Sequence, residues 1–245
     1  MHRLGVTVED AGFDVRDTIA WLYWTGFPKS VDAEREVARL AGRSDDSTID
    51  PSRWVGFGTA VKPTHEPALL ARKPMPGTLA ANLVEWGTGV LNVEACRVEA
   101  GDPAWPGPDS SFVGARFPAN VYHCPKPSRA EKEHGCDTLP ERSGAQAVER
   151  RDGSAGLRSP RAGAGRTAAT VRNWHPTVKP VRLMRWLCRL VGGLPGSVIV
   201  DTFAGSGTTL VAAHVEGFRC IGIEREPRFC DIARARLERA TKETP

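Results

Sequence analysis

The clearest hydrophobic pattern lies near the C-terminal end of the chain. A helix is predicted from Pro180 to Gly192, because large apolar residues recur there at helical spacing: Leu183, Met184, Leu187, Leu190 and Val191. After it, the pattern predicts a strand, a helix, a strand and a helix, over residues 197–201, 207–216, 219–224 and 227–240. This alternation is typical of parallel strands joined by a crossover helix, and it predicts an α/β fold.

The N-terminal part of the chain carries a second ordered region. Residues 13–24 are rich in β-branched and aromatic side chains, which favours a mostly buried strand. The other elements expected here are a short helix ending at Gly12, a helix over 31–43 ending at Gly42, loops over 44–64 and a strand around 68–71.

The middle of the chain shows much less periodicity. Residues 76–120 are rich in Gly, Pro and Trp, without a clear helix or strand period. Residues 141–172 combine Gly, Ala, Ser and Arg and contain no large apolar cluster. Because such a stretch buries too little surface to offset its ordering entropy, we expect 141–172 to be a mobile loop.

Charge is distributed unevenly along the 245 residues. The net charge is only +4, yet residues 141–190 hold 11 Lys/Arg against 3 acids, a local balance of +8. A basic stripe of this kind fits a polyanion such as nucleic acid, and a solvated loop is the alternative explanation. The N-terminus lacks a secretory pattern, no membrane span is expected, and the six scattered cysteines indicate reduced thiols, so we expect a cytoplasmic protein.

The candidate chemistry begins where the strand over 197–201 meets the next helix. The strand stops at Asp201, and Gly205 and Gly207 would let the backbone adopt positive φ and bring free amides close to a ligand. Glu224, at the end of the following strand, is placed to accept hydrogen bonds from ribose hydroxyls. The pattern favours a nucleoside ligand, with a plain connecting turn as the alternative.

The glycine spacing narrows the ligand. A dinucleotide fingerprint needs a third glycine where this chain has Leu210, and the Gly-Lys-Ser/Thr of a phosphate loop is absent from the sequence. A nucleoside without a pyrophosphate, such as S-adenosylmethionine, is therefore favoured over NAD. The same glycine spacing disfavours the hypothesis that the chain is a nicotinamide-dependent oxidoreductase.

Several blocks together resemble one family. DTFAGSGTT (201–209), GFRCIGIEREPRFCDIARARL (217–237) and HPTVKP (175–180) are similar to motifs of the β-type amino-DNA methyltransferases, which act on adenine N6 or cytosine N4, notably those of phages and actinobacteria. Residues 10–30 and 56–74 are also similar to stretches of that family. The resemblance implies a circularly permuted, Rossmann-like methyltransferase fold with three parts: an N-terminal half of the core (1–75), a target-recognition-like insertion (76–172) and a cofactor-binding half (173–245).

The same resemblance implies a role for each motif residue. The S-adenosylmethionine turn would be formed by Asp201, Phe203, Gly205, Ser206 and Gly207, and Thr208 and Thr209 would begin the helix. Glu224 would hold the ribose, and the methionine carboxylate would be contacted or flanked by His175, Thr177 and Lys179. A plain surface lysine is the alternative for Lys179. Thr202 stands where the family usually has proline, which should loosen the turn slightly.

One family motif is absent. The Asp/Asn/Ser-Pro-Pro-aromatic tetrapeptide that holds the target base does not occur in the 245 residues, so no catalytic residue is assigned. We expect this motif upstream of Met1 or in a partner chain, and we expect an incomplete sheet in which strand 197–201 has an unpaired edge. The expected partner is double-stranded DNA, and an inactive cofactor- or DNA-binding remnant is the alternative.

Metal binding is not expected. His123, Cys124, His134 and Cys136 lie close in sequence, but their spacing matches no common zinc site. A polar loop with incidental thiols is the favoured explanation.

Overall fold

The computed structural model describes residues 2–26, 28, 30–44, 46–99, 102, 114–143 and 170–244. Most of the basic segment expected to be a mobile loop, residues 144–169, lies outside this part of the chain. In the described residues, three sheets are present, with strand orders β2-β1-β3, β4-β5 and β6-β7.

The N-terminal sheet is built around the long strand β1 (Asp14–Leu22), which follows helix α1 (His2–Asp10). β1 pairs antiparallel with β2 (His65–Arg72) and parallel with the short β3 (Val121–His123). The strands expected over 13–24 and around 68–71 are therefore confirmed.

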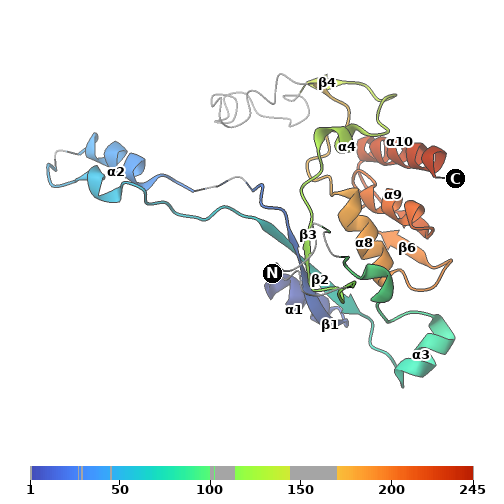
Figure 1. The fold of residues 1–245 in the computed structure, drawn as a ribbon. Helices are drawn as coiled ribbons and strands as arrows, with labels where there is room; N and C mark the ends of the chain where they lie inside the picture. Colours follow the sequence, from blue (N-terminus) through green and yellow to red (C-terminus); the bar gives the residue numbers. More distant parts are fainter. Residues whose placement is uncertain are drawn as a thin grey trace.

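A long arm connects β1 to β2. It carries helix α2 (Ala33–Ala41) and the 3₁₀ helix η1 (Pro51–Trp54), and Figure 1 shows it extending far from the rest of the molecule. Both helices start at an aspartate that accepts a backbone amide: Asp32 from Arg35, at 3.2 Å, and Asp50 from Ser52, at 2.9 Å. These caps fix the helices locally, without support from a core.

The middle of the chain contains elements that its weak periodicity did not predict. They are helix α3 (Leu79–Trp86), the 3₁₀ helix η2 (Glu94–Cys96), helix α4 (Arg129–Glu133) and the short strands β4 (Arg142–Ser143) and β5 (Thr170–Val171). α3 is defined by its ends: Thr78 accepts the amide of Ala81, and Gly87 adopts a left-handed φ of 63° at the C-cap.

The C-terminal part follows the predicted alternation closely. It consists of α8 (Val181–Val191), β6 (Val198–Asp201), α9 (Thr208–Val215), β7 (Arg219–Gly222) and α10 (Pro227–Glu243). β6 and β7 are parallel and in register from Val198 opposite Arg219 to Asp201 opposite Gly222. The predicted strand–helix–strand–helix unit is confirmed.

Helix α8 joins the two halves of the molecule. Its Trp186 is 3% exposed and stacks on Tyr122 of β3, with ring centroids 4.6 Å apart. Trp21 of β1 belongs to the same buried cluster. On its other side, α8 places Cys188 against the fully buried Ala212 and Ala213 of α9. α8 thus packs against both the N-terminal sheet and the glycine-containing half.

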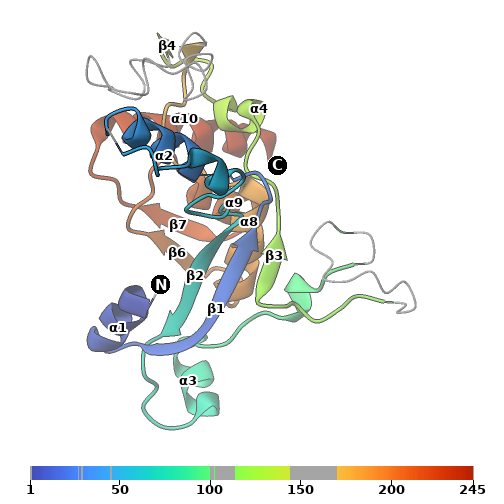
Figure 2. The same ribbon diagram turned by 90° about the vertical axis from the view of Figure 1, so that its left-hand side faces the viewer.

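The β6–β7 pair is exposed on one face. Within the described residues, β6 pairs only with β7. Figure 2 shows β6 and β7 side by side, and Figure 1 shows helix α8 between β6 and the strands β1, β2 and β3. The exposed fractions are 55% for Val200, 53% for Ile221 and 54% for Ile223. In the part of the chain that the structure describes, the expected unpaired edge of β6 is present.

Candidate cofactor site

The turn between β6 and α9, residues 202–207, is called the glycine turn below. Gly205 and Gly207 adopt φ values of 53° and 73°, a region that side chains disfavour. A Cβ on Gly205 would lie 2.7 Å from His175 Nε2, and one on Gly207 would lie 2.8 Å from the Cβ of Ala233. Backbone conformation and close packing therefore both require glycine at these positions.

Asp201 closes the glycine turn from the strand side. Its Oδ1 accepts the backbone amide of Phe203 at 3.0 Å, and its Oδ2 accepts the hydroxyl of Thr209 in the first turn of α9. The carboxylate thus ties the start of the turn to the start of the helix.

Glu224 closes the turn from the neighbouring strand. Its Oε2 accepts the amide of Gly205 at 2.8 Å, and its Oε1 accepts the amide of Glu226 at 2.9 Å. Hydrogen bonds from the amides of Glu226 and Gly205 lower the pKa of Glu224. The amide of Gly205 is therefore occupied by a carboxylate, which differs from the free amide that the turn pattern predicted.

Arg236 of α10 binds the glycine turn from the side of that helix. It was not among the residues predicted from the sequence. It is 3% exposed, and its Nη1 donates to the carbonyl of Ser206 at 2.7 Å and to the hydroxyl of Thr208 at 2.9 Å. Burial lowers the pKa of Arg236. One sequence signal could have found it: Arg236 falls on the buried stripe of α10 with Ile232, Ala233 and Ala240.

The buried hydroxyls of the turn face this arginine. Ser206 and Thr208 are 3% and 4% exposed, and Arg236 contacts both hydroxyl groups. Phe203, by contrast, is 90% exposed. A ligand on the outer side of the turn would therefore meet the backbone and the ring of Phe203.

His175 lies beside Gly205 of the glycine turn. It is half-buried, its ring meets Phe229 edge-on with centroids 4.5 Å apart, and its Nε2 occupies the space that a Cβ on Gly205 would need. Burial, the largest effect, lowers the pKa of His175. A neutral imidazole is therefore favoured beside the turn.

The other two predicted residues of the HPTVKP motif are Thr177 and Lys179. Thr177 is exposed, with its amide 3.4 Å from His175 Nδ1. Lys179 Nζ lies 2.5 Å from Glu66 Oε2 on β2 and 5.5 Å from the ring centroid of Trp21. The lysine expected near the methionine carboxylate is therefore paired with a carboxylate of the protein itself.

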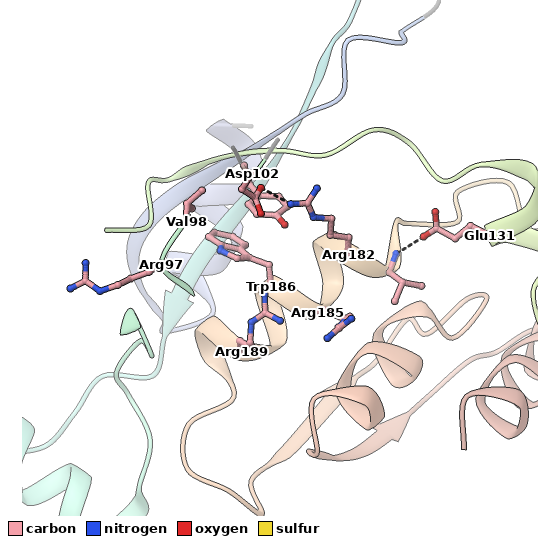
Figure 3. A pocket seen from close by; sticks show the side chains of 10 residues that line it. Arg97, Val98, Asp102, Glu131, Arg182, Arg185, Trp186 and Arg189 are labelled. Atoms are coloured by element: carbon pink, nitrogen blue, oxygen red, sulfur yellow. Dashed lines mark hydrogen bonds and ion pairs between the residues drawn. The ribbon is translucent and has the colours of Figure 1, made fainter. Parts of the chain in front are cut away.

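A separate cavity of about 570 Å³ lies beside α8, away from the glycine turn. Figure 3 shows Arg182, Arg185 and Arg189 of α8 around it, with Trp186. Each arginine is matched by an acid: Arg182 pairs with Asp102, and Arg185 and Arg189 both pair with Glu216. This cavity shares no residue with the predicted cofactor site.

The described residues contain neither a metal-ligand cluster nor a membrane-spanning helix. There, no group of three or more His, Cys, Asp or Glu side chains is arranged to hold a metal ion. His134 instead contacts Glu243 at 2.8 Å, and the Cys124 and Cys136 thiols are buried. No helix in this part of the chain is long and apolar enough to cross a membrane.

Two curated relatives are similar to this chain. A type II methyltransferase of Haemophilus influenzae, M.HindIII, is 25% identical over 239 residues, covering 96% of this chain and 59% of that protein. A type II methyltransferase of Streptococcus pneumoniae, M2.DpnII, is 43% identical over 77 residues, covering 30% of this chain and 28% of that protein. The chain thus spans at most 59% of the length of these relatives.

Solved structures give more distant matches. The M1.HpyAVI–SAM complex shares 18% identity with a TM-score of 0.44, covering 96% of this chain and 68% of that one. The cytosine-N4-specific PvuII DNA methyltransferase shares 15% identity with a TM-score of 0.47, covering 98% and 60%.

The family itself is shown by a sequence model. The model described as DNA methylase, N6_N4_Mtase, matches residues 1–235, which include the glycine turn, Glu224 and His175. The chain belongs to the N6/N4 DNA methylase family.

Proposed function

We propose that this chain takes part in site-specific DNA methylation, moving a methyl group from S-adenosylmethionine to the exocyclic amine of adenine (N6) or cytosine (N4) in double-stranded DNA. The proposal depends most on one observation. The glycine turn is held from both sides, by Glu224, two residues after β7, and by Arg236 of α10, within a chain that belongs to the DNA methylase family.

The residues around the turn suit an adenosyl ligand. A side chain at Gly205 would fill the space against His175, so only glycine leaves the backbone open there. The carboxylate of Glu224 can exchange a backbone amide for ribose hydroxyls, and the exposed ring of Phe203 can pack against a purine. A neutral His175 adds no positive charge that would repel a sulfonium.

The contribution of the protein is then positioning and electrostatics. Bound S-adenosylmethionine supplies an electrophilic methyl group on a sulfonium. The turn, Glu224 and His175 would hold and orient the donor, so that the lone pair of the amine meets the methyl group directly and no covalent enzyme intermediate is needed. The target base must leave the helical stack to reach this position.

A second candidate function is binding of cofactor and DNA without methyl transfer by this chain. It is favoured by the absence of the Asp/Asn/Ser-Pro-Pro-aromatic tetrapeptide from these 245 residues. The choice between adenine and cytosine depends on the same tetrapeptide.

Two measurements on the purified chain separate these functions. Titration calorimetry measures affinity for S-adenosylmethionine, and a tritiated-methyl assay measures transfer to duplex DNA. Binding with transfer supports the enzyme, whereas binding without transfer supports the second candidate. Absence of binding by a folded chain would overturn both. Glu224→Ala should abolish binding, and Glu238→Gln, an exposed acid on α10, is the matched control.

A further inference from the structure

Trp174, the residue directly before the HPTVKP motif, gathers arginines from separate parts of the chain. The guanidinium carbon of Arg142 lies 4.3 Å from the Trp174 ring centroid, and that of Arg228 lies 4.8 Å away. Arg172 lines the same hollow as these three residues. We call Arg142, Arg172, Trp174 and Arg228 the arginine–tryptophan cluster.

The cluster is assembled by long-range structure. Arg142 lies in β4, Arg172 directly follows β5, and Arg228 is the second residue of α10. The β4–β5 pairing brings the first two together, because Arg142 lies opposite Val171. Three segments far apart in sequence therefore place cations around one indole ring.

Acids also lie near the cluster. Arg172 pairs with Glu141 at 2.7 Å, and Arg228 lies 3.7 Å from Glu226. Asp231 lines the hollow but contacts Arg234, at 3.2 Å. Stacking on an aromatic ring uses the face of a guanidinium and leaves its edge geometry suited to bidentate contact with phosphate.

Two further features point to a polyanion at this place. β4 and β5 flank residues 144–169, whose sequence holds five arginines against two acids, Glu149 and Asp152. The cluster also borders the candidate cofactor site, because Trp174 and His175 both contact the ring of Phe229, at 5.1 Å and 4.5 Å between centroids. A phosphate backbone bound here would lie beside the glycine turn.

We propose that the arginine–tryptophan cluster binds the phosphodiester backbone of duplex DNA and so brings the substrate to the cofactor turn. This inference rests on the proposed function, since it names the surface through which that substrate is held. Arginine contacts to phosphate position a duplex without reading its sequence.

The test is the salt dependence of DNA binding, measured by fluorescence anisotropy with a labelled duplex. Each phosphate contact contributes about 0.9 to the slope of log affinity against log salt. Arg142→Gln and Arg228→Gln should each lower that slope by about one and weaken binding equally for unrelated sequences. Arg39→Gln, which alters an exposed arginine of α2 on the distant arm, is the control and should leave the slope unchanged.

Three outcomes would overturn the inference. They are an unchanged slope in both cluster variants, no duplex binding by the unaltered chain, and complete displacement of DNA by millimolar inorganic phosphate at matched ionic strength, which would indicate a discrete phosphate site instead. Affinity for S-adenosylmethionine, measured on the same preparations, should not change in Arg142→Gln. If the unaltered chain had no affinity for S-adenosylmethionine, the proposed function would be contradicted, but the DNA-binding result could still be interpreted.

Discussion

Arg236 Nη1 donates a hydrogen bond to the carbonyl oxygen of Ser206 at 2.7 Å, and this contact anchors the glycine turn to helix α10. The guanidinium is buried, so its lost hydration must be replaced by the oxygens of Ser206 and Thr208. The dependence is mutual, because these oxygens are also buried and have the arginine as their donor.

Replacing this arginine tests that dependence. Arg236→Met should lower the free energy of unfolding by about 2–4 kcal/mol, because hydrogen bonds to a charged group are lost and buried oxygens stay unpaired. Urea unfolding measures the change. Arg236→Lys keeps the charge and one donor, so it should lose less. If Arg236→Met were as stable as the parent, Arg236 would not anchor the glycine turn to α10 in the way proposed.

Gly205 and Gly217 form a matched pair for a second prediction. Both have positive φ, 53° and 77°, but only at Gly205 would a Cβ meet another side chain, that of His175. Gly217→Ala should therefore cost only the left-handed strain of about 1–2 kcal/mol. Gly205→Ala should cost more and also abolish S-adenosylmethionine binding. Calorimetry and thermal unfolding check both variants, and equal effects would argue against a tight turn.

Glu224 predicts a dependence of stability on pH. Backbone hydrogen bonds to the carboxylate lower its pKa in the folded chain. Its contribution is therefore present above the unfolded-state value of about 4.3 and is lost as the pH falls through the lower folded value. Urea midpoints measured from pH 6 to pH 3 should fall less steeply in Glu224→Gln than in the parent. Identical profiles would exclude the contribution.

Variants of Lys179 and Glu66 test whether the lysine of the HPTVKP motif contacts the methionine carboxylate of the cofactor, as the family resemblance implies. Both side chains are 40% exposed, so their ion pair should contribute at most about 1 kcal/mol to stability. If Lys179 also contacts the methionine carboxylate, Lys179→Met should weaken cofactor binding strongly with little loss of stability. Glu66→Gln should retain or improve binding, since it releases the lysine. If Lys179→Met kept an unchanged affinity for S-adenosylmethionine, Lys179 would serve only in its ion pair with Glu66.

The thiols provide a fifth test. Cys96, Cys124, Cys136 and Cys188 are buried, and burial raises the pKa of both Cys136 and Cys188 to about 11. At pH 8, a thiol reagent should therefore label at most Cys220 and Cys230 in the native chain, and all six cysteines after denaturation. Rapid labelling of four or more native thiols would contradict this packing.

The sequence predicts best where local pattern decides the structure. The elements from α8 to α10, the parallel pairing of β6 with β7, and the positive φ of Gly205 and Gly207 follow from periodicity and glycine spacing. Helix α3 was not predicted because its apolar residues lie mostly exposed and follow no stripe, and its caps at Thr78 and Gly87 are the only signal.

Long-range contacts explain the remaining differences. Lys179 meets Glu66 across 113 positions, and Arg236 reaches Ser206 across 30. No local sequence pattern indicates which carboxylate pairs with a given lysine. Nor does it indicate which buried oxygens accept hydrogen bonds from a given arginine in place of water. The sequence therefore drew attention to Asp201 and Glu224, which bind amides of the glycine turn. Arg236, which binds the carbonyl of Ser206, was identified only from the structure.

The apolar strip of β6 and β7 has a practical consequence for every assay above. Val198 and Val200 of β6, Ile221 of β7 and Ile223 just after it are 40–55% exposed, and the ring of Phe203 in the glycine turn is 90% exposed. Such a surface attracts other copies of the polypeptide and adsorbs to plastic or to hydrophobic dyes as its concentration rises. Titrations are therefore best run at low protein concentration with a mild non-ionic detergent, and an apparent stoichiometry that drifts with dilution would trace back to these five side chains.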